Sequence, residues 1–344
     1  MKRVRFGIVG MGIGQAAGRA IAMDPRGMVA ALCDLDTGRM DGFAAELPEP
    51  VKQYTDYHTL CADPDIDAIF VGTPNQLHVP VGLAAVRAGK HVLCTKPLSD
   101  SEEAGRELVA AAEAAGVVNM MSLSMRYGGA IQYLGGLSRR GDLGEIYYAR
   151  ARSVRRSGIP DWGAHFIRAG GGAFRDMAVH VLDAAWWMAG CPEPVSATGV
   201  AGAKFGPRGM GYWEYHTVSP DYAAQYGADD YGAGLVRFVN GAAIQVESFW
   251  ASHQADELQI ELFGTDGGAK LDPPTLYRTI DGCPADTTLR PPAREGFAGM
   301  AAHFIACVLD GAECQSPLQH GLTVQRMLEA VLRAAETGKE VRLA

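Results

Sequence analysis

The chain has 344 residues, which is long enough for two domains that each bury a core. Its hydrophobic fraction of 48% and charged fraction of 20% are those of a globular protein. The formal net charge of -8 argues against a nucleic acid as partner, because neutralising phosphates requires clustered lysine and arginine. The sequence has no apolar run of about 18 residues and no signal-peptide pattern, so we expect a cytoplasmic protein without a membrane partner.

Cysteine and histidine usage predicts no metal centre. The seven cysteines are scattered without a Cys-x-x-Cys pair, and the nine histidines form no His-Glu-x-x-His motif. This distribution predicts reduced, mostly buried thiols rather than a disulfide framework or a zinc site.

Residues 4–34 have the pattern of a nucleotide-binding unit. An apolar strand at 4–9 leads through a glycine-rich turn into an alanine-rich helix at 15–23 and a second strand at 28–33. Glycine lets the turn bend tightly and approach a pyrophosphate, whose charge is met by free N–H groups and the positive end of the helix. We expect the turn residues to contact the cofactor: Gly10, Met11, Gly12, Ile13 and Gly14.

The acid that ends the second strand indicates which nicotinamide cofactor binds. Asp34 lies about 20 residues past the turn, where an acid accepts hydrogen bonds from the adenosine ribose. Asp36 follows, and no lysine or arginine stands directly beside the two acids, so repulsion of a 2′-phosphate favours NAD over NADP. The turn departs from the standard spacing, because Gly14 comes one residue early. Either the turn is one residue shorter, or Gln15 takes the place of the third glycine.

Strands and helices alternate up to residue 122. We expect helices at 37–47, 78–88 and 99–115, and strands at 51–54, 68–72, 91–95 and 117–122. Ser99 and Glu102 form a capping box for the third of these helices, and Gly116 ends it. The alternation predicts a Rossmann domain over 1–122, with a parallel sheet, right-handed crossovers and helices on both faces.

Beyond residue 122 the strands gather together. We expect strands at 146–154, 195–204, 234–239, 242–250 and 258–264, and helices at 173–189, 296–309 and 318–337. Asn240 and Gly241 are typical of a hairpin turn. The pattern predicts an α+β domain over 123–344, with a large, mostly antiparallel, open-faced sheet for substrate binding and oligomerisation. The helices within 296–337 are expected to pack back toward the first domain.

Two loops that follow strands carry unusual residues. Ligands of open parallel sheets collect outside the carboxyl ends of the strands. Thr73, Pro74 and Asn75 follow the fourth expected strand, and Lys96 and Pro97 follow the fifth. Lys96 stands where its ammonium would reach the nicotinamide end of a dinucleotide; the alternative is a solvated lysine in a turn. The bond from Lys96 to Pro97 is of the kind that can be cis.

Asp176 and His180 form a second candidate pair. A triple glycine at 170–172 leads into a helix on which the two residues stand four apart and therefore share a face. An aspartate near an imidazole favours the protonated ring and fixes its tautomer, which suits a base. The alternative is structural: Asp176 meets the helix dipole, and His180 is a hydrogen-bonded core histidine.

Aromatic side chains gather between residues 212 and 231. Flat rings with polar rims suit the faces and hydroxyls of a sugar, but aromatic loops are equally common at subunit contacts. Asp161 and Trp162 are a second candidate wall of a substrate pocket, suited to specificity rather than to chemistry.

Three of these stretches together resemble the Gfo/Idh/MocA family of oxidoreductases. They are the Thr-Pro-Asn-x-x-His loop at 73–78, the Gly-Lys-His-Val stretch that ends in Lys-Pro at 89–97, and the Asp-x-x-x-His helix at 176–180. The resemblance covers almost the whole chain and implies an NAD-dependent sugar or inositol dehydrogenase that forms a homodimer or homotetramer. It also implies cofactor contacts from five residues: Thr73, Pro74, Asn75, His78 and Lys96.

The resemblance implies a role for each catalytic candidate. Lys96 hydrogen-bonds the reacting hydroxyl and steadies the developing alkoxide, and His180 removes the hydroxyl proton as hydride leaves carbon. Asp176 orients His180 or holds a neighbouring hydroxyl. The same comparison implies the further substrate residues Arg126, Asp161 and Trp162.

Two positions depart from the family pattern. Thr95 stands where the family has a glutamate before the lysine, and Ser124 where it commonly has asparagine. Two other functions stay open beside the dehydrogenase. One is an NAD-assisted redox glycosidase, which shows no net reduction of NAD. The other is a non-catalytic NAD-dependent sugar sensor, against which the retained Lys96, Asp176 and His180 argue.

Overall fold

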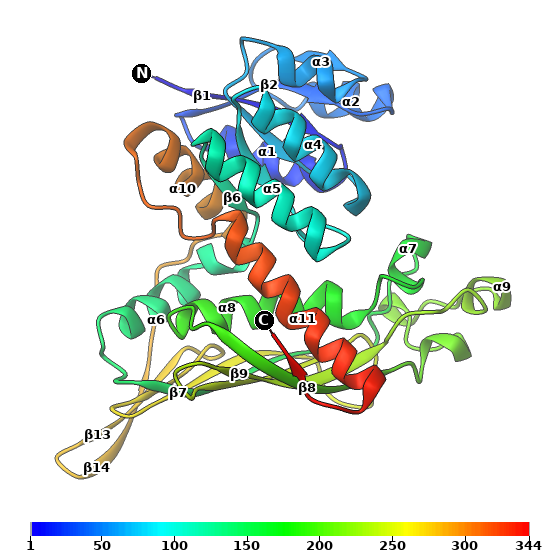
Figure 1. Cartoon of the computed structure of the whole chain (residues 1–344). Helices are drawn as coiled ribbons and strands as arrows, with labels where there is room; N and C mark the ends of the chain where they lie inside the picture. Colours follow the sequence, from blue (N-terminus) through cyan, green and yellow to red (C-terminus); the bar gives the residue numbers. More distant parts are fainter. Residues whose placement is uncertain (1, 344) are drawn as a thin grey trace. The chain divides into compact units, whose positions relative to one another are not determined.

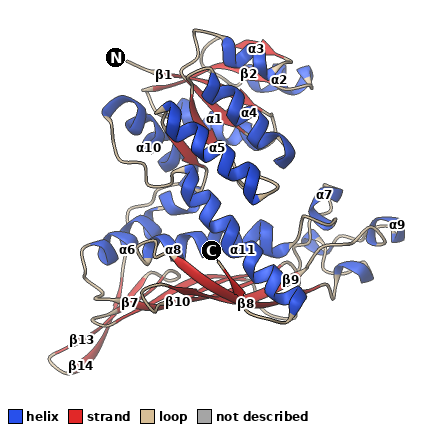
Figure 2. Cartoon of the chain, viewed as in Figure 1, coloured by secondary structure: helices blue, strands red, loops and turns tan. Residues whose placement is uncertain are grey.

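The computed structural model describes residues 2–343 and divides into two compact units. Unit 1 comprises Met1–Gly128 and Arg294–Thr323, and unit 2 comprises Gly129–Ala293 and Val324–Ala344. Figure 1 follows the chain through both units, and Figure 2 separates their helices from their strands by colour. Within residues 2–343, no helix is both long and apolar enough to cross a membrane.

Unit 1 is built on a six-stranded parallel sheet with the strand order β3-β2-β1-β4-β5-β6. Its strands are β1 (Val4–Val9), β2 (Gly27–Cys33), β3 (Lys52–Tyr54), β4 (Ala68–Val71), β5 (His91–Cys94) and β6 (Asn119–Met121). This order is that of a Rossmann fold, which binds dinucleotides where the order reverses beside β1. The predicted fold class of this part is confirmed.

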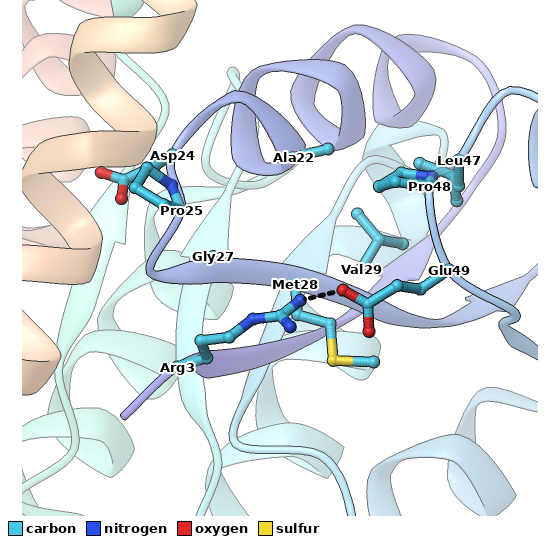
Figure 3. A pocket seen from close by; sticks show the side chains of 10 residues that line it. All are labelled: Arg3, Ala22, Asp24, Pro25, Gly27, Met28, Val29, Leu47, Pro48 and Glu49. Carbon is cyan, nitrogen blue, oxygen red and sulfur yellow. Dashed lines mark hydrogen bonds and ion pairs between the residues drawn. The ribbon is translucent and has the colours of Figure 1, made fainter. Parts of the chain in front are cut away.

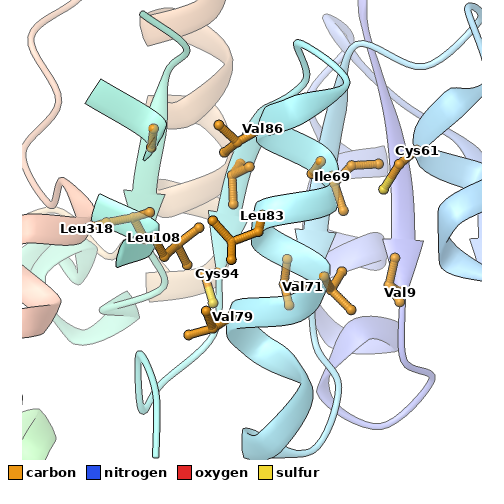
Figure 4. Packing of buried hydrophobic residues seen from close by; sticks show 14 of the residues in the cluster. Val9, Cys61, Ile69, Val71, Val79, Leu83, Val86, Cys94, Leu108 and Leu318 are labelled. Atoms are coloured by element: carbon orange, nitrogen blue, oxygen red, sulfur yellow. The ribbon is translucent and has the colours of Figure 1, made fainter. Parts of the chain in front are cut away.

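Helices cover both faces of the sheet in unit 1. They are α1 (Ile13–Met23), α2 (Thr37–Ala44), α3 (Tyr57–Ala62), α4 (His78–Arg87), α5 (Glu102–Ala115) and α10 (Gly296–Asp310). One buried cluster unites the sheet with α3, α4 and α5, and includes Val71, Leu83 and Leu108 (Figure 4). The other unites it with α1, α2 and α10, where the rings of Phe6 and Phe304 lie 5.5 Å apart. Apolar side chains on both sheet faces are thereby removed from water.

The N-terminus of α5 differs from the predicted one. The N-cap is Ser101, whose side chain accepts a hydrogen bond from Ala104 N at 3.2 Å. Ser99 is buried instead, and its Oγ donates to Ser101 O at 2.6 Å. The predicted capping box of Ser99 and Glu102 is therefore wrong, because two serines compete for the cap and the chain leaving β5 carries the first one inward. Gly116 ends the helix in a left-handed conformation, with φ of 63°.

Unit 2 is built on a nine-stranded sheet with the order β14-β13-β12-β11-β7-β10-β9-β8-β15. Its strands are β7 (Ile146–Val154), β8 (Pro194–Gly202), β9 (Tyr231–Phe238), β10 (Ala243–Phe249), β11 (Glu257–Gly264), β12 (Gly268–Lys270), β13 (Thr275–Ile280), β14 (Cys283–Thr288) and β15 (Val341–Arg342). All neighbouring strands in it are antiparallel except β7 and β10. The predicted mostly antiparallel sheet is confirmed.

The two faces of this sheet differ in chemistry. Beside the sheet, unit 2 holds α6 (Gly129–Arg139), α7 (Ala164–Ile167), α8 (Val179–Met188), α9 (Pro220–Ala223) and most of α11 (Leu318–Thr337). Glycines let α11 approach: a Cβ on Gly199 or Gly234 would lie 2.6 or 2.5 Å from Val331 Cγ1. On β7, alternate residues point to the other face, where Arg150 and Arg152 each lie 3.1 Å from Glu261 of β11.

Candidate functional site

The glycine-rich turn of unit 1 lies against the end of β4. Gly10 has φ of 93°, and a Cβ there would lie 2.5 Å from Gly72 O, so only glycine fits. Gly12 is the N-cap of α1 with no side-chain cap, and nothing lies within 4 Å of where its Cβ would be. α1 therefore presents its first N–H groups to open space at the carboxyl end of the sheet, which is the arrangement that binds a pyrophosphate.

The spacing of the glycines is explained by where α1 begins. It starts at Ile13, two residues earlier than predicted. Gly14 then packs against β1, because a Cβ there would lie 2.8 Å from Ile8 Cγ2. Close helix–strand packing is the work of the third glycine in a Rossmann turn. Gln15 instead donates from Nε2 to Met11 O at 3.0 Å, so the structure favours the shorter turn.

Asp34 is fixed beside this turn. Its Oδ2 accepts a hydrogen bond from Met11 N at 2.6 Å, and its Oδ1 accepts one from Asp36 N at 3.0 Å. A carboxylate has about four acceptor sites, so lone pairs remain for ribose hydroxyls. Arg39 of α2 forms an ion pair with Asp36, at a distance of 3.5 Å, and Asp36 offsets the positive charge of Arg39 there.

His78 joins the two loops that follow β4 and β5. Its ring is fully buried, with Nδ1 2.6 Å from Pro97 O and Nε2 2.8 Å from Thr73 O. Both ring nitrogens face backbone oxygens, one in each loop, so His78 links the two loops. Lys96 lies two residues after the end of β5 and is half-buried, and its peptide bond to Pro97 is cis.

The buried hydroxyl of Thr73 indicates a ligand site. Within residues 2–343, its Oγ1 has no hydrogen-bond partner. A buried hydroxyl without a partner costs about 1–3 kcal/mol, so few persist without a reason. Pro74 is exposed beside it, and Asn75 begins the short helix Asn75–Leu77. The Thr73 hydroxyl and the open space at Gly12 fit a dinucleotide at this end of the sheet.

Arg126 is fully buried in unit 1. Its Nη1 donates to Gln315 O at 2.6 Å and lies 3.0 Å from His320 Nδ1. Burial, aided by Arg126, lowers the pKa of His320 to about 4, so the ring is neutral and can accept this hydrogen bond. These contacts join the short helix Ser124–Tyr127 to the start of α11.

In unit 2, the triple glycine makes a tight entry into a helix. A Cβ on Gly171 would lie 2.0 Å from Phe166 O. Gly172 has φ of 112°, and a Cβ there would lie 2.1 Å from Asp229 Oδ1. Asp229 Oδ2 accepts a hydrogen bond from Phe174 N at 2.8 Å and so caps the helix from another segment. Only glycine leaves room for this carboxylate.

Asp176 lies in a π-helical turn, Phe174–Ala178, and His180 lies in α8, which follows it. The predicted uninterrupted α-helix from 173 is therefore wrong over its first turn. One π turn shifts the apolar pattern by a single residue, which periodicity cannot reveal; such turns are frequent at functional sites. Trp250, buried at the end of β10, donates from Nε1 to Asp176 Oδ2 at 3.3 Å and orients that carboxylate.

Two predicted pocket walls come together in unit 2. Asp161 Oδ2 lies 2.7 Å from His216 Nδ1. The ring of Trp162 meets that of Trp213 edge to face, with centroids 5.4 Å apart. Because Trp162 is 59% exposed, this corner presents aromatic edges and polar atoms to solvent.

A separate pocket lies at the amino ends of β1 and β2 (Figure 3). Its lining includes Pro25, Gly27 and the ion pair of Arg3 with Glu49. Ligands of Rossmann sheets bind at the carboxyl ends of the strands, so this pocket is not the cofactor site.

Sequence reasoning missed Asp229, whose only signal is that it lies within the aromatic stretch between residues 212 and 231. Burial raises the pKa of Asp229 to about 6. From about pH 4 to pH 6 the folded chain holds a proton that the unfolded chain has released, so the free energy of unfolding falls as pH rises. A shift of about two pKa units, at about 1.4 kcal/mol for each unit, makes this fall about 3 kcal/mol. We expect Asp229→Asn to remove this slope in urea unfolding curves. Asp221→Asn, an exposed acid of the same segment, should keep it, and identical slopes in wild type and Asp229→Asn would contradict the assignment.

Both parts of the chain match one oxidoreductase family. Residues 4–123 match the description "Oxidoreductase family, NAD-binding Rossmann fold", and residues 131–270 match the GFO/IDH/MocA C-terminal domain. D-glucoside 3-dehydrogenase of Escherichia coli K12 is 30% identical over 80% of this chain and 79% of its own. Inositol 2-dehydrogenase of Rhizobium meliloti is 25% identical over 99% of each chain. The crystal structure of an NAD binding oxidoreductase from Klebsiella pneumoniae has a TM-score of 0.83 at 25% identity, with 99% of both chains covered.

The family matches, together with the Rossmann sheet and its glycine turn, define a nicotinamide-dependent oxidoreductase. The chain belongs to the GFO/IDH/MocA oxidoreductase family, which confirms the resemblance drawn from its motifs.

Proposed function

We propose that this protein oxidises a secondary hydroxyl of a sugar, a cyclic polyol or a sugar derivative, with NAD as hydride acceptor. The observation that carries the proposal is the dinucleotide end of unit 1, with open space at Gly12, the fixed carboxylate of Asp34 and the unpaired hydroxyl of Thr73. The relatives supply the substrate class, because D-glucoside 3-dehydrogenase and inositol 2-dehydrogenase are named for a sugar derivative and a cyclic polyol. The predicted homodimer or homotetramer stays a prediction.

Three side chains take part in the reaction in this proposal, and two of them act on the reacting hydroxyl. NAD, when bound, accepts the hydride. His180 takes the hydroxyl proton, and Lys96 donates a hydrogen bond to the oxygen as its negative charge develops. Both are needed because a secondary alcohol is a poor hydride donor until its proton is leaving and its oxygen is stabilised. Asp176, held by Trp250, orients His180 or holds a neighbouring hydroxyl.

The aromatic corner of unit 2 supports a sugar as substrate. The edges of Trp162 and Trp213 offer apolar surface for the C–H face of a pyranose or cyclitol ring. The polar atoms of Asp161 and His216 beside them suit ring hydroxyls. We assign these residues to specificity, since no group there is needed for hydride transfer.

Lys96→Met tests the proposed alkoxide stabiliser, because methionine keeps the length of the side chain and removes the ammonium. We expect kcat to fall about 10²–10³-fold, the cost of losing one donor to a developing oxyanion. The affinity for NAD should fall by a smaller factor than kcat, since the interaction with the substrate oxygen strengthens only as charge develops. Lys2→Ala, at an exposed lysine of the same unit, is the control. Turnover of Lys96→Met equal to wild type would remove Lys96 from the mechanism.

Asp34→Asn tests the choice of NAD over NADP. Asparagine keeps an oxygen that can accept from Met11 N but loses the charge that repels a 2′-phosphate. Wild type should prefer NAD in kcat/KM, and the variant should shift the ratio toward NADP by about tenfold or more, equivalent to about 1.4 kcal/mol. An unchanged ratio would show that Asp34 does not set the preference.

A further inference from the structure

Two thiols and an imidazole lie together near the C-terminal end of α10. The Sγ atoms of Cys307 and Cys314 and a ring nitrogen of His303 lie within 4.8 Å of one another. His303 and Cys307 stand four apart on α10 and therefore share a face. Gly311 ends the helix in a left-handed conformation, with φ of 67°, and the chain that follows brings Cys314 back to them.

The cluster differs chemically from the other cysteines in the core. Burial raises the pKa of Cys33 to about 12 and that of Cys61 to about 11, which keeps both as inert thiols. The pKa of Cys307 is lowered instead, because Cys314 hydrogen-bonds to its thiolate, and the pKa of Cys314 is raised by the same contact. The pair thus combines a thiolate nucleophile with a protonated partner, as in dithiols that oxidise reversibly.

The imidazole is already engaged by the backbone. His303 Nε2 lies 3.5 Å from Cys307 Sγ and accepts a hydrogen bond from Gln315 N at 3.0 Å. A ring nitrogen has one lone pair, so Nε2 cannot bind Gln315 N–H and a metal ion at once. The geometry therefore favours chemistry between the two sulfurs over a metal centre with two thiolates and one imidazole.

We propose that Cys307 and Cys314 are a redox-active dithiol that a small hydroperoxide converts into an intramolecular disulfide. The Cys307 thiolate attacks the peroxide; the S–O bond forms, the O–O bond breaks, and the leaving oxyanion takes a proton from water. The Cys314 sulfur then attacks the sulfenic acid; the S–S bond forms, the S–O bond breaks, and the thiol proton leaves with the hydroxyl as water. The sulfurs lose two electrons and the peroxide gains them. Cys307 is buried, but Cys314 and His303 are partly exposed and give a small peroxide its access.

The oxidation would alter contacts at the edge of the Rossmann sheet. Cys314 Sγ lies 3.5 Å from Asn119 O, and Ser316 Oγ donates to Met121 O at 3.0 Å, so this segment lies along β6. Forming the disulfide removes the thiol proton of Cys314 and ties the segment to α10. The modification site is therefore part of the structure that supports β6.

The test treats the reduced, full-length protein with one equivalent of hydrogen peroxide. Thiols are counted after unfolding, and disulfide-linked peptides are identified by mass spectrometry. We expect two of the seven thiols to be lost, a peptide that links Cys307 to Cys314, and full recovery with dithiothreitol. Cys314→Ser should give no cross-link and accumulate a sulfenic acid at Cys307 that dimedone captures. Cys283→Ser, at an exposed cysteine outside the cluster, should lose the same two thiols as wild type.

Two results would overturn the proposal. One is oxidation of Cys283 or Cys191 while Cys307 and Cys314 remain available to alkylation in the unfolded chain. The other is one equivalent of zinc that purifies with the wild-type protein and is lost from the serine variants of both cluster cysteines, because the cluster would then be a metal centre. Circular dichroism confirms that each variant is folded, and alanine variants replace any serine variant that is not.

Discussion

His180→Ala should lower the rate of NADH formation from a sugar or polyol by about 10²–10⁴-fold, the range expected for loss of a general base. The alcohol proton would then have to leave to water while hydride departs, and this raises the barrier of the chemical step. Added imidazole should restore part of the rate, because it supplies the same ring as a base. The measurement is the initial rate of nicotinamide reduction at saturating NAD.

The control for this prediction is His253→Ala, at an exposed histidine of the same unit. It should turn over as wild type does, and both variants should bind NAD with unchanged affinity. If His180→Ala kept wild-type turnover, the base would have to be another group. If its turnover fell but NAD affinity fell equally, His180 would support the cofactor rather than the proton transfer.

Gly10→Ala should lower the free energy of unfolding by roughly 2–5 kcal/mol, for two reasons. Alanine would have to adopt a backbone conformation with positive φ, and its Cβ would clash with neighbouring backbone atoms. The added Cβ would lie 2.5 Å from Gly72 O and 2.8 Å from Thr73 N. These are backbone atoms at the end of β4, so no side-chain rotation relieves the contact. Denaturant unfolding of the purified variant measures the loss.

Gly12→Ala is the matched substitution in the same turn. Nothing lies within 4 Å of its added Cβ, so its stability should stay within about 0.5 kcal/mol of wild type. Its methyl group would instead occupy the space through which a pyrophosphate approaches, so the affinity for NAD should fall at least about tenfold. Equal destabilisation by Gly10→Ala and Gly12→Ala would contradict the assignment of separate roles to the two glycines.

Much of unit 1 could be predicted from the sequence, because its signals are local. The apolar run of β1, the glycines after it and the acid after β2 follow one another along the chain, and the structure brings Asp34 to Met11 N as that order implies. The cap of α5 could not be resolved, because Ser99 and Ser101 are both good caps and only tertiary packing decides between them.

The candidate site in unit 2 was less predictable, because its supports come from distant segments. The sequence predicted Asp176 and His180 from their spacing, but not the π turn that carries Asp176. Asp229 lies 55 residues along the chain from Phe174, from whose N–H it accepts a hydrogen bond, and Trp250 lies 74 residues from Asp176, to which it donates. No local pattern marks such partners. The strands β12 to β14 were not predicted either, because they are short and carry little alternation of apolar residues.

We propose above all that this chain transfers hydride from a carbinol carbon of a sugar or polyol to NAD. The most direct measurement is to incubate the enzyme and NAD with substrates deuterated at each secondary carbinol position of D-glucosides and inositols, and to follow deuterium in the nicotinamide ring by mass spectrometry. We expect net NADH formation, deuterium transfer from one position of an accepted substrate, and a slower rate for the substrate deuterated at that position. A folded protein that binds NAD but gains no nicotinamide deuterium from any of these substrates would contradict it.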